Sequence, residues 1–331
     1  MPGKSEKNKM KYYLGIDVGG TSVKCGVVSA DGVILAKDSF PTPPRAEDIP
    51  AQAAALCRTL LDGCCMAECD ITAVGVGLPG TVDAKAGVVR YANNIHMRDL
   101  PFVRLFREQT DLPTYIGNDA NAAALGEVCF GAARGLSSAV LVTLGTGVGT
   151  GIVIDGRLLE GEGGAGAEGG HICLVYNGEK CSCGRRGCYE AYASATALKR
   201  QTAAAAEAHP ESLLAAEVAQ NGVSGKTAFA CARAGDAVAQ RVTEQYLSYV
   251  AAGITDLVNL FRPQIVLIGG GISNEEASCF ETVSDIVNRE SYGSEIHTTP
   301  LPVRPAALRN DAGILGAAAI AIFAAEKEQG R

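Results

Sequence analysis

The sequence LGIDVGGTSVKCGVVSADGVIL at residues 14–35 decides the fold, because a similar pattern, LVTLGTGVGTGIVIDGRLL, occurs again at residues 141–159. Each stretch consists of an apolar strand, a glycine-rich turn and a second β-rich strand, followed by an Asp-Gly pair that favours a tight hairpin. A chain of 331 residues is long enough for about two domains. The repeat therefore predicts a duplicated architecture, with one copy in each domain.

The rest of the chain alternates helix-like and strand-like patterns. Helix-like patterns occupy residues 47–69, 190–208, 235–260 and 312–327, and another begins after Asn118. The apolar stretches ITAVGVGL (71–78) and PQIVLIGGGIS (263–273) have the pattern of buried strands, and the second runs into glycines. Alternating strands and helices predict an α/β fold with mixed sheets.

The composition is that of a globular protein without a general affinity for polyanions. Hydrophobic residues make up 47% of the chain, charged residues 20%, and the formal net charge is -7. Nucleic acid and anionic membranes are therefore not expected as partners. No secretory signal and no apolar run of about 18 residues is found, so we expect a cytoplasmic protein whose cysteines are reduced.

The turn DVGGTSVK at residues 17–24 has the features of a phosphate-binding element. Paired glycines between strands let the backbone approach a phosphate, while a hydroxyl and an ammonium group add donors. An acid at the end of the first strand is suited to hold Mg²⁺. The candidate residues are Asp17, Gly19, Gly20, Thr21 and Lys24. For this turn alone, a glycine-containing hairpin without a ligand is the alternative.

Two further glycine-rich strand ends strengthen the nucleotide interpretation. They contribute Gly145, Thr146, Gly147, Gly269 and Gly270. Three such turns predict a nucleotide cradle built from both domains. Two other nucleotide motifs do not fit: no G-x-x-x-x-G-K-[ST] stretch occurs, and no helical pattern follows the G-x-G-x-x-G of residues 75–80.

Asp119 is the candidate catalytic base. The Asn118-Asp119 pair stands between a short strand and an alanine-rich helix, where either residue could simply cap the helix. Phosphoryl transfer to an alcohol needs a carboxylate that accepts the hydroxyl proton close to the bound nucleotide. In a chain with a predicted phosphate cradle, Asp119 is the carboxylate best placed for this role.

One histidine and three cysteines form a candidate structural zinc site. The proposed ligands are His171, Cys181, Cys183 and Cys188. One imidazole and three thiolates make a closed tetrahedral set, which leaves no position for a catalytic water. A redox pair and unrelated free thiols are the alternatives.

The metal would also organise a sugar pocket. Zinc fixes the orientation of His171 and leaves its other nitrogen for a ligand. Glu168 and Glu190 flank the metal ligands, and carboxylates together with an imidazole are suited to sugar hydroxyls. Either glutamate taken singly could instead be an exposed residue without a role.

These motifs together resemble the ROK family of sugar kinases and regulators, from about Tyr12 to Ala325. DVGGTSVK, GLPGTVD, NDANAAALGE, LGTGVGTG, the E-G-G-H of residues 168–171 and CSCGRRGCYEAYAS are similar to the successive family signatures. Two positions depart from the family pattern: Ala167 stands where glycine is usual, and Gly117 stands where an acid is frequent.

The resemblance implies an actin-like ATPase (ribonuclease H-like) fold, duplicated, with two domains and an interdomain cleft. The small N-terminal domain would be 11–118, completed by the C-terminal helix 312–327, and the large domain with the zinc site would be 119–311. A homodimer is also implied, as is Asp119 acting on the sugar 6-hydroxyl. The implied sugar contacts are Asn94, Asn118, Glu168, His171 and Glu190.

The expected function is ATP-dependent phosphorylation of a hexose at its 6-hydroxyl, with ATP, Mg²⁺ and structural Zn²⁺. Glucose is the expected substrate, and N-acetylmannosamine or N-acetylglucosamine is the alternative. Family repressors carry a DNA-binding module ahead of this fold, whereas the first phosphate motif here begins at Asp17. A non-catalytic sugar-binding regulator is the other alternative, but the presence of Asp17, Lys24 and Asp119 together favours an enzyme.

Overall fold

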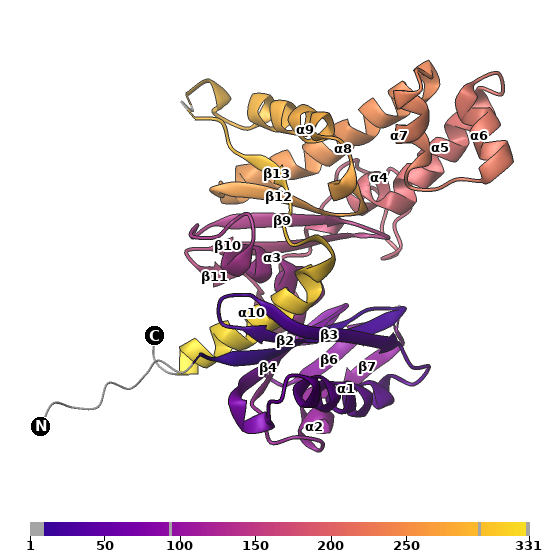
Figure 1. Ribbon diagram of the computed structural model, residues 1–331. Helices are drawn as coiled ribbons and strands as arrows, with labels where there is room; N and C mark the ends of the chain where they lie inside the picture. Colours follow the sequence, from indigo (N-terminus) through magenta and orange to yellow (C-terminus); the bar gives the residue numbers. More distant parts are fainter. Residues whose placement is uncertain (1–9, 93–94, 297–298, 329–331) are drawn as a thin grey trace, which may run out of the picture. The chain divides into compact units, whose positions relative to one another are not determined.

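The computed structural model describes residues 10–92, 95–296 and 299–328 (Figure 1). The chain divides into two compact units. Unit 1 comprises the described residues of Met1–Leu136, Leu158–Ala167 and Asn310–Arg331. Unit 2 comprises those of Ser137–Arg157 and Glu168–Arg309. Each unit contains one five-stranded sheet.

The sheet of unit 1 has the strand order β3-β2-β1-β4-β8. The strands are β1 (Tyr12–Val18), β2 (Ser22–Ser29), β3 (Ile34–Pro41), β4 (Ile71–Leu78) and β8 (Thr114–Asn118). β1, β2 and β3 run antiparallel, whereas β1, β4 and β8 are parallel neighbours. A second sheet of three short strands follows β4, and consists of β5 (Thr81–Asp83), β6 (Val88–Ala92) and β7 (Met97–Leu100).

Helices cover both faces of the first sheet. They are α1 (Ile49–Gly63), α2 (Phe102–Arg107), α3 (Asp119–Phe130) and α10 (Ala312–Glu328). Leu14 and Ile16 point into a core shared with α1, while Gly15 between them faces α10. Because successive residues of a strand point to opposite faces, α1 and α10 lie on opposite sides of the sheet.

Three glycines allow α10 to lie directly against its neighbours. A Cβ atom on Gly15 would overlap the carbonyl group of Ile314, and one on Gly75 would overlap that of Ala317. On the other side of the helix, a Cβ on Gly316 would overlap the Ala122 carbonyl of α3. The last helix of the chain is therefore packed backbone to backbone between the sheet and α3.

Unit 2 repeats the topology of unit 1. Its sheet has the order β11-β10-β9-β12-β13, formed by β9 (Ala139–Leu144), β10 (Val148–Ile154), β11 (Arg157–Leu158), β12 (Ile265–Gly270) and β13 (Val303–Pro305). As in unit 1, the first hairpin is antiparallel and the next two strands are parallel to its first strand. The predicted duplication and the mixed α/β sheets are thus confirmed.

The remaining helices of unit 2 are α4 (Glu190–Ala193), α5 (Ala195–Ala208), α6 (Leu213–Asn221), α7 (Thr227–Arg233), α8 (Ala237–Phe261) and α9 (Ala277–Glu290). The predicted helix over residues 190–208 is two helices, because Ser194 is extended and caps α5 through the Ala197 N–H. Contacts group α3 with unit 1, whereas the division expected from sequence began the large domain at Asp119. Among the described residues, no helix is both long and apolar enough to cross a bilayer.

The packing of α10 predicts that Gly75→Ala is strongly destabilising. The added methyl group would force apart β4 and the α10 backbone, which costs about 2 kcal/mol or more of unfolding free energy. Urea denaturation followed by circular dichroism measures the loss. Gly63→Ala is the matched control, since a Cβ there meets nothing within 4 Å. Equal stability of the two variants would contradict the close packing.

Candidate active site

Parallel pairing brings three strand ends of unit 1 into one row. Asp17 of β1 lies opposite Gly77 of β4, which in turn lies opposite Gly117 of β8. Neighbouring strands are about 4.8 Å apart, so β1 and β8 are separated by roughly 10 Å. Asp119 follows β8 directly. The two candidate carboxylates therefore lie at the carboxyl edge of the same sheet, which is where open α/β sheets bind ligands.

Asp17 and Lys24 face one another across the first hairpin. They are directly paired between β1 and β2, and Nζ of Lys24 lies 3.5 Å from Oδ2 of Asp17. Burial raises the pKa of the Asp17 carboxyl, and the Lys24 ammonium only partly offsets this rise. The first turn itself is closed by the Gly19 N–H, which donates to the Ser22 carbonyl at 3.0 Å. An incompletely compensated carboxylate of this kind is suited to a hard cation.

Asn118 is the N-cap of α3. Its Oδ1 accepts hydrogen bonds from the N–H groups of Ala120 (2.9 Å) and Asn121 (3.2 Å). Its Nδ2 donates to the carbonyl of Gly80 at 2.9 Å. The capping role that the residue type favours is therefore present, and a contact with a sugar stays a prediction.

Asp119 occupies the first turn of α3 and is exposed. Its Oδ1 accepts a hydrogen bond from the Ala120 N–H at 2.8 Å, and a carboxylate at this end of a helix interacts favourably with the helix dipole. Two residues later, Asn121 is 5% exposed, and its Oδ1 has no hydrogen-bond partner among the described residues. Sequence reasoning missed Asn121, because its burial depends on packing around α3.

The second and third glycine turns are neighbours in unit 2. The third strand end lies beside the second, with Gly269 opposite Thr143 and Gly270 opposite Leu144. Gly270 has a φ of 84°, and a Cβ there would overlap the Leu144 carbonyl. Only glycine fits this backbone comfortably. Two of the three predicted phosphate turns are thus brought together at one sheet edge.

A cavity of about 450 Å³ begins where the third turn ends. Its walls come from the segment after β12, from α9 and from β13, and its size is within the range of small-molecule pockets, about 300–1,000 Å³. The lining residues include Ser273, Phe280, Asp285, Arg304, Pro305 and Arg309. No sequence motif marks these residues apart from the adjacent glycines, because α9 and β13 meet only in the folded unit.

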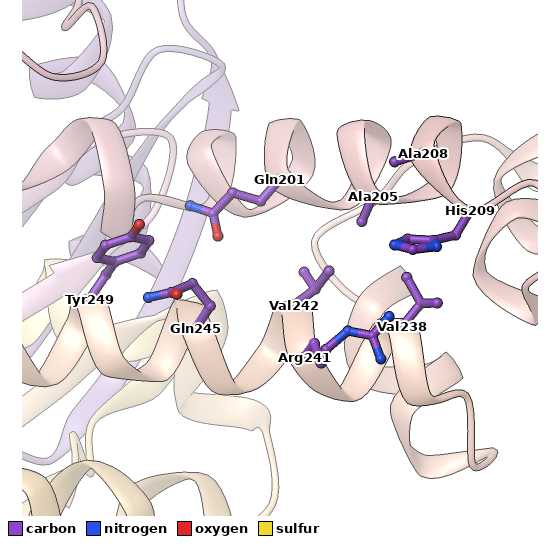
Figure 2. Close-up of a pocket in the computed structure, with 9 residues that line it drawn as sticks. All are labelled: Gln201, Ala205, Ala208, His209, Val238, Arg241, Val242, Gln245 and Tyr249. Carbon is purple, nitrogen blue, oxygen red and sulfur yellow. The ribbon is translucent and has the colours of Figure 1, made fainter.

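A second hollow, of about 260 Å³, lies between α5 and α8 (Figure 2). Its lining residues are Gln201, Ala205, Ala208, His209, Val238, Arg241, Val242, Gln245 and Tyr249. None of these lining residues has a carboxylate, and the Nδ1 of the lining imidazole, His209, lies 3.5 Å from Oε1 of Glu211.

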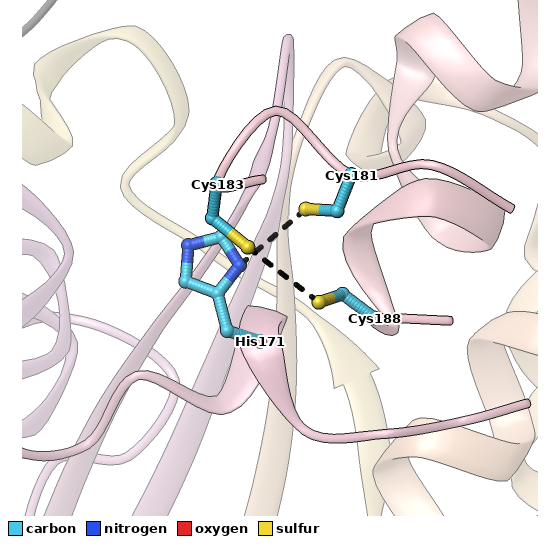
Figure 3. A group of neighbouring side chains, drawn as sticks. All are labelled: His171, Cys181, Cys183 and Cys188. Atoms are coloured by element: carbon cyan, nitrogen blue, oxygen red, sulfur yellow. Dashed lines mark hydrogen bonds between the residues drawn. The ribbon is translucent and has the colours of Figure 1, made fainter. Parts of the chain in front are cut away.

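The four predicted metal ligands converge in unit 2 (Figure 3). The ligand atoms of His171, Cys181, Cys183 and Cys188 lie within 4.8 Å of one another. Nδ1 of His171 is 3.7 Å from the Cys181 sulfur, and the sulfurs of Cys183 and Cys188 are also 3.7 Å apart. A disulfide bond would need about 2.0 Å, whereas tetrahedral thiolates around one zinc ion are separated by roughly 3.8 Å.

The environment of the three thiols also favours a cation. Burial raises the pKa of the Cys181 thiol to about 12, and burial together with Cys183 raises the pKa of Cys188. Burial also acts to raise the pKa of Cys183, but the Arg185 N–H and the two neighbouring thiols lower it overall. Three thiolates this close together repel one another, so a bound cation is needed to hold all of them ionised.

Glu190 and Glu168 have different surroundings. Glu190 begins α4, and its Oε2 accepts a hydrogen bond from the Val148 N–H at 3.1 Å. Its Oε1 accepts one from the Ser182 hydroxyl at 2.7 Å, and Ser182 lies between Cys181 and Cys183. Glu168 is exposed, and its carbonyl accepts the His171 N–H at 3.0 Å. Sequence reasoning did not identify Ser182.

The order of these motifs is that of a known family. Residues 13–323 match the ROK family. The chain belongs to the ROK family.

Close relatives among ROK proteins are glucokinases. The glucokinase of Halalkalibacterium halodurans is 36% identical over 310 residues, which is 92% of this chain and 93% of the relative. The glucokinase of Thermotoga maritima is 37% identical over 311 residues, which is 93% of this chain and 96% of the relative. The crystal structure of a ROK family glucokinase from Streptomyces griseus with glucose and AMPPNP has a TM-score of 0.80 and 37% identity, and the match covers 94% of this chain and 99% of that one.

The structure explains Gly117, one of the two departures from the ROK pattern, whereas nothing in it explains the alanine at position 167. Ala167 has a φ of 59°, a left-handed conformation that glycine adopts more easily than alanine. At Gly117 a Cβ would approach the Ile320 side chain of α10 at 2.8 Å, so the space beside this residue is already filled. The predicted sugar contact Asn94 lies outside the described residues.

Burial of Asp17 predicts that Asp17→Asn makes the protein more stable. The raised pKa means that ionising the carboxyl costs stability at neutral pH; this cost shrinks as the pH falls through the folded-state pKa and disappears below the lower, unfolded-state pKa. Thermal denaturation should therefore show a higher midpoint for the variant at pH 7 and a smaller difference in acid. Asp31→Asn, at an exposed hairpin position, is the control. A lower midpoint for Asp17→Asn at pH 7 would show that the Lys24 pair dominates.

Proposed function

We propose that this ROK protein is an ATP-dependent hexose kinase that phosphorylates glucose at its 6-hydroxyl. The observation that carries the proposal is the common sheet edge of Asp17 and Asp119, which lie two strands apart and are assigned as cation-binding carboxylate and base. Glucokinases at 36–37% identity over most of the chain support the same reaction.

The nucleotide phosphates are assigned to the three glycine turns. In unit 1, Gly19 and Gly20 let the backbone approach the phosphates while Thr21 and Lys24 supply donors, and the turns ending β9 and β12 are assigned the same role in unit 2. The cavity beyond the third turn fits the nucleoside, with Phe280 and Pro305 as apolar surfaces. Asp17 is the assigned oxygen ligand for Mg²⁺, which neutralises phosphate charge when bound.

Asp119 is assigned the proton-transfer step. Its carboxylate accepts the proton of the sugar 6-hydroxyl while that oxygen attacks the terminal phosphorus of ATP. The new oxygen–phosphorus bond forms as the bond to the bridging oxygen of ADP breaks. ADP leaves with the electron pair, and the proton passes from Asp119 to solvent.

The cluster of His171 and three cysteines is assigned to structural Zn²⁺. The 3.7 Å separations fit four ligands around one ion, and the set leaves no position for a catalytic water. With Nδ1 of His171 facing the cysteines, Nε2 is the atom assigned to a sugar hydroxyl.

The assigned sugar contacts are Asn94, Asn118, Glu168, His171 and Glu190. They bind hydroxyls that glucose shares with N-acetylmannosamine and N-acetylglucosamine, so an N-acetylhexosamine kinase is the alternative function. A homodimer is the proposed assembly. A sugar-binding regulator without turnover is disfavoured, because Asp17, Lys24 and Asp119 are all present.

Asp119→Asn is expected to lower kcat by at least about 100-fold, since an amide cannot accept the proton. Glucose affinity should change little. A coupled ADP-release assay across hexoses and N-acetylhexosamines measures both substrate choice and the loss. Asp111→Asn, an exposed loop residue of the same unit, is the control. Near-normal turnover by Asp119→Asn would rule out the assigned base.

Removing the metal is expected to weaken glucose binding, because His171 loses the ligand that orients it. Elemental analysis should find one zinc per chain, and calorimetry should show weaker glucose binding after chelation that zinc restores. Cys183→Ser should lose the metal, whereas Cys173→Ser, an exposed cysteine outside the cluster, should keep it. Active protein without zinc would exclude the assignment.

A further inference from the structure

Glu190 connects the metal-binding loop to the second glycine turn. Its Oε1 accepts the Ser182 hydroxyl at 2.7 Å and lies 3.5 Å from the Cys181 sulfur. Its Oε2 accepts the N–H of Val148, the first residue after Gly147, at 3.1 Å. The Glu190 carboxylate therefore bonds both to Ser182, which lies between two metal ligands, and to the Val148 backbone at the end of the predicted phosphate turn.

The turn lies directly against this carboxylate. A Cβ on Gly147 would overlap Oε2 of Glu190, so the glycine is needed for the contact. A displaced Glu190 would leave the Val148 N–H without its acceptor and would remove the surface on which the turn rests. Hydrogen bonds to charged groups are stronger than those between neutral groups, so this contact is suited to hold a short turn in one conformation.

The segment after Glu190 holds the other residues of the turn. The Ala195 N–H donates to the Gly145 carbonyl at 2.8 Å, and the Thr196 hydroxyl donates to the Thr146 carbonyl at 2.8 Å. This segment begins two residues after the metal ligand Cys188. Every residue of the turn is therefore in contact with the chain that leaves the cluster.

The chain that enters the cluster is attached to the same hairpin. The Gly169 N–H donates to the Thr150 hydroxyl of β10 at 2.8 Å, and a Cβ on Gly170 would overlap the Val148 carbonyl. His171 follows at once. Both ends of the metal-binding segment thus contact β10: Gly169 and Gly170 just before the cluster, and Glu190 just after it.

The metal-binding loop itself has little regular structure to hold it. Between Cys173 and Cys188 the described structure has only isolated bridges and turns, and Cys183 and Arg185 are exposed. Hydrogen bonds within the loop already hold its backbone, such as those from the Cys181 N–H to the Arg185 carbonyl at 2.9 Å and from the Gly187 N–H to the Glu179 carbonyl at 2.7 Å. Metal–ligand bonds at Cys181 and Cys183, on either side of Ser182, add a further constraint on the position of that exposed serine.

We propose that Glu190 is a positioning residue that couples the metal cluster to the turn Gly145–Gly147, so that metal occupancy sets nucleotide affinity as well as sugar affinity. This inference rests on the proposed assignment of that turn to the ATP phosphates. A Glu190 that only contacted sugar would make glucose affinity depend on this residue and leave the nucleotide unaffected. Ser182, which holds Oε1, separates the two roles because it is neither a metal ligand nor an assigned sugar contact.

The first test measures hydrogen–deuterium exchange of the peptide covering residues 145–150 in zinc-loaded and chelated protein without ligands. Exchange is expected to accelerate on chelation and in zinc-loaded Ser182→Ala, since the Val148 N–H loses its fixed acceptor. Ser248→Ala is the matched control, because that serine also donates one hydrogen bond in unit 2 but lies on α8. Unchanged exchange on chelation would overturn the coupling.

The second test measures AMPPNP affinity by calorimetry in the same proteins, with metal content checked by elemental analysis. Chelation and Ser182→Ala are each expected to weaken AMPPNP binding by about three- to tenfold. Chelating the Ser182→Ala variant should weaken its AMPPNP binding little further, because both changes act through Glu190 and their effects are not additive. If Ser182→Ala loses zinc, Glu190→Gln, which keeps every metal ligand, replaces it. If the AMPPNP affinities of wild type, chelated protein and variant agree within about twofold, the coupling is contradicted. If zinc-loaded wild type binds no AMPPNP, the proposed function is contradicted as well.

Discussion

The register of the parallel strands is the constraint on which the first unit's chemistry depends. Asp17, Gly77 and Gly117 form one row across β1, β4 and β8, so a shift of one strand by one residue would turn its side chains to the opposite face. Glycines at two of these three positions make room for the helices, since a Cβ at Gly77 would meet Ala122 of α3 and one at Gly117 would meet Ile320 of α10. α10 fixes the strands from one side through the close contacts at Gly15 and Gly75. A helix from the end of the chain thereby stabilises a site built from its beginning.

Unit 2 uses the same topology with a different means of support. Its hairpin β9–β10 has no charged pair corresponding to Asp17 and Lys24, since Thr143 lies opposite Gly149. The turn is held instead by the segment that follows Cys188, through Glu190, Ala195 and Thr196. Duplication thus supplied two similar turns, and different side chains now position them.

Sequence reasoning predicted the parts of the structure that depend on local pattern. The repeat at residues 14–35 and 141–159 predicted the two sheets, and the capping preference of Asn118 agrees with its observed hydrogen bonds. The spacing of His171 and the three cysteines predicted a cluster that the structure forms. Each of these signals lies within a short stretch of chain.

The features that were missed depend on residues distant in sequence. Ser182 meets Glu190 only because a loop folds back on itself, and Val148, 42 residues before Glu190, offers an N–H that no motif reports. The cavity beyond β12 forms where α9 meets β13, and the burial of Asn121 reflects packing around α3. Such contacts follow from the tertiary structure and leave no periodicity in the sequence.

The position of the transferred phosphate tests the central claim most directly. The protein is incubated with ATP and ¹³C-labelled glucose, and carbon–phosphorus coupling in the product is measured by NMR. A kinase acting on the 6-hydroxyl gives coupling at the sixth carbon, with ADP formed in equal amount. Phosphate on the anomeric carbon, or ADP formed without any sugar phosphate, would contradict it.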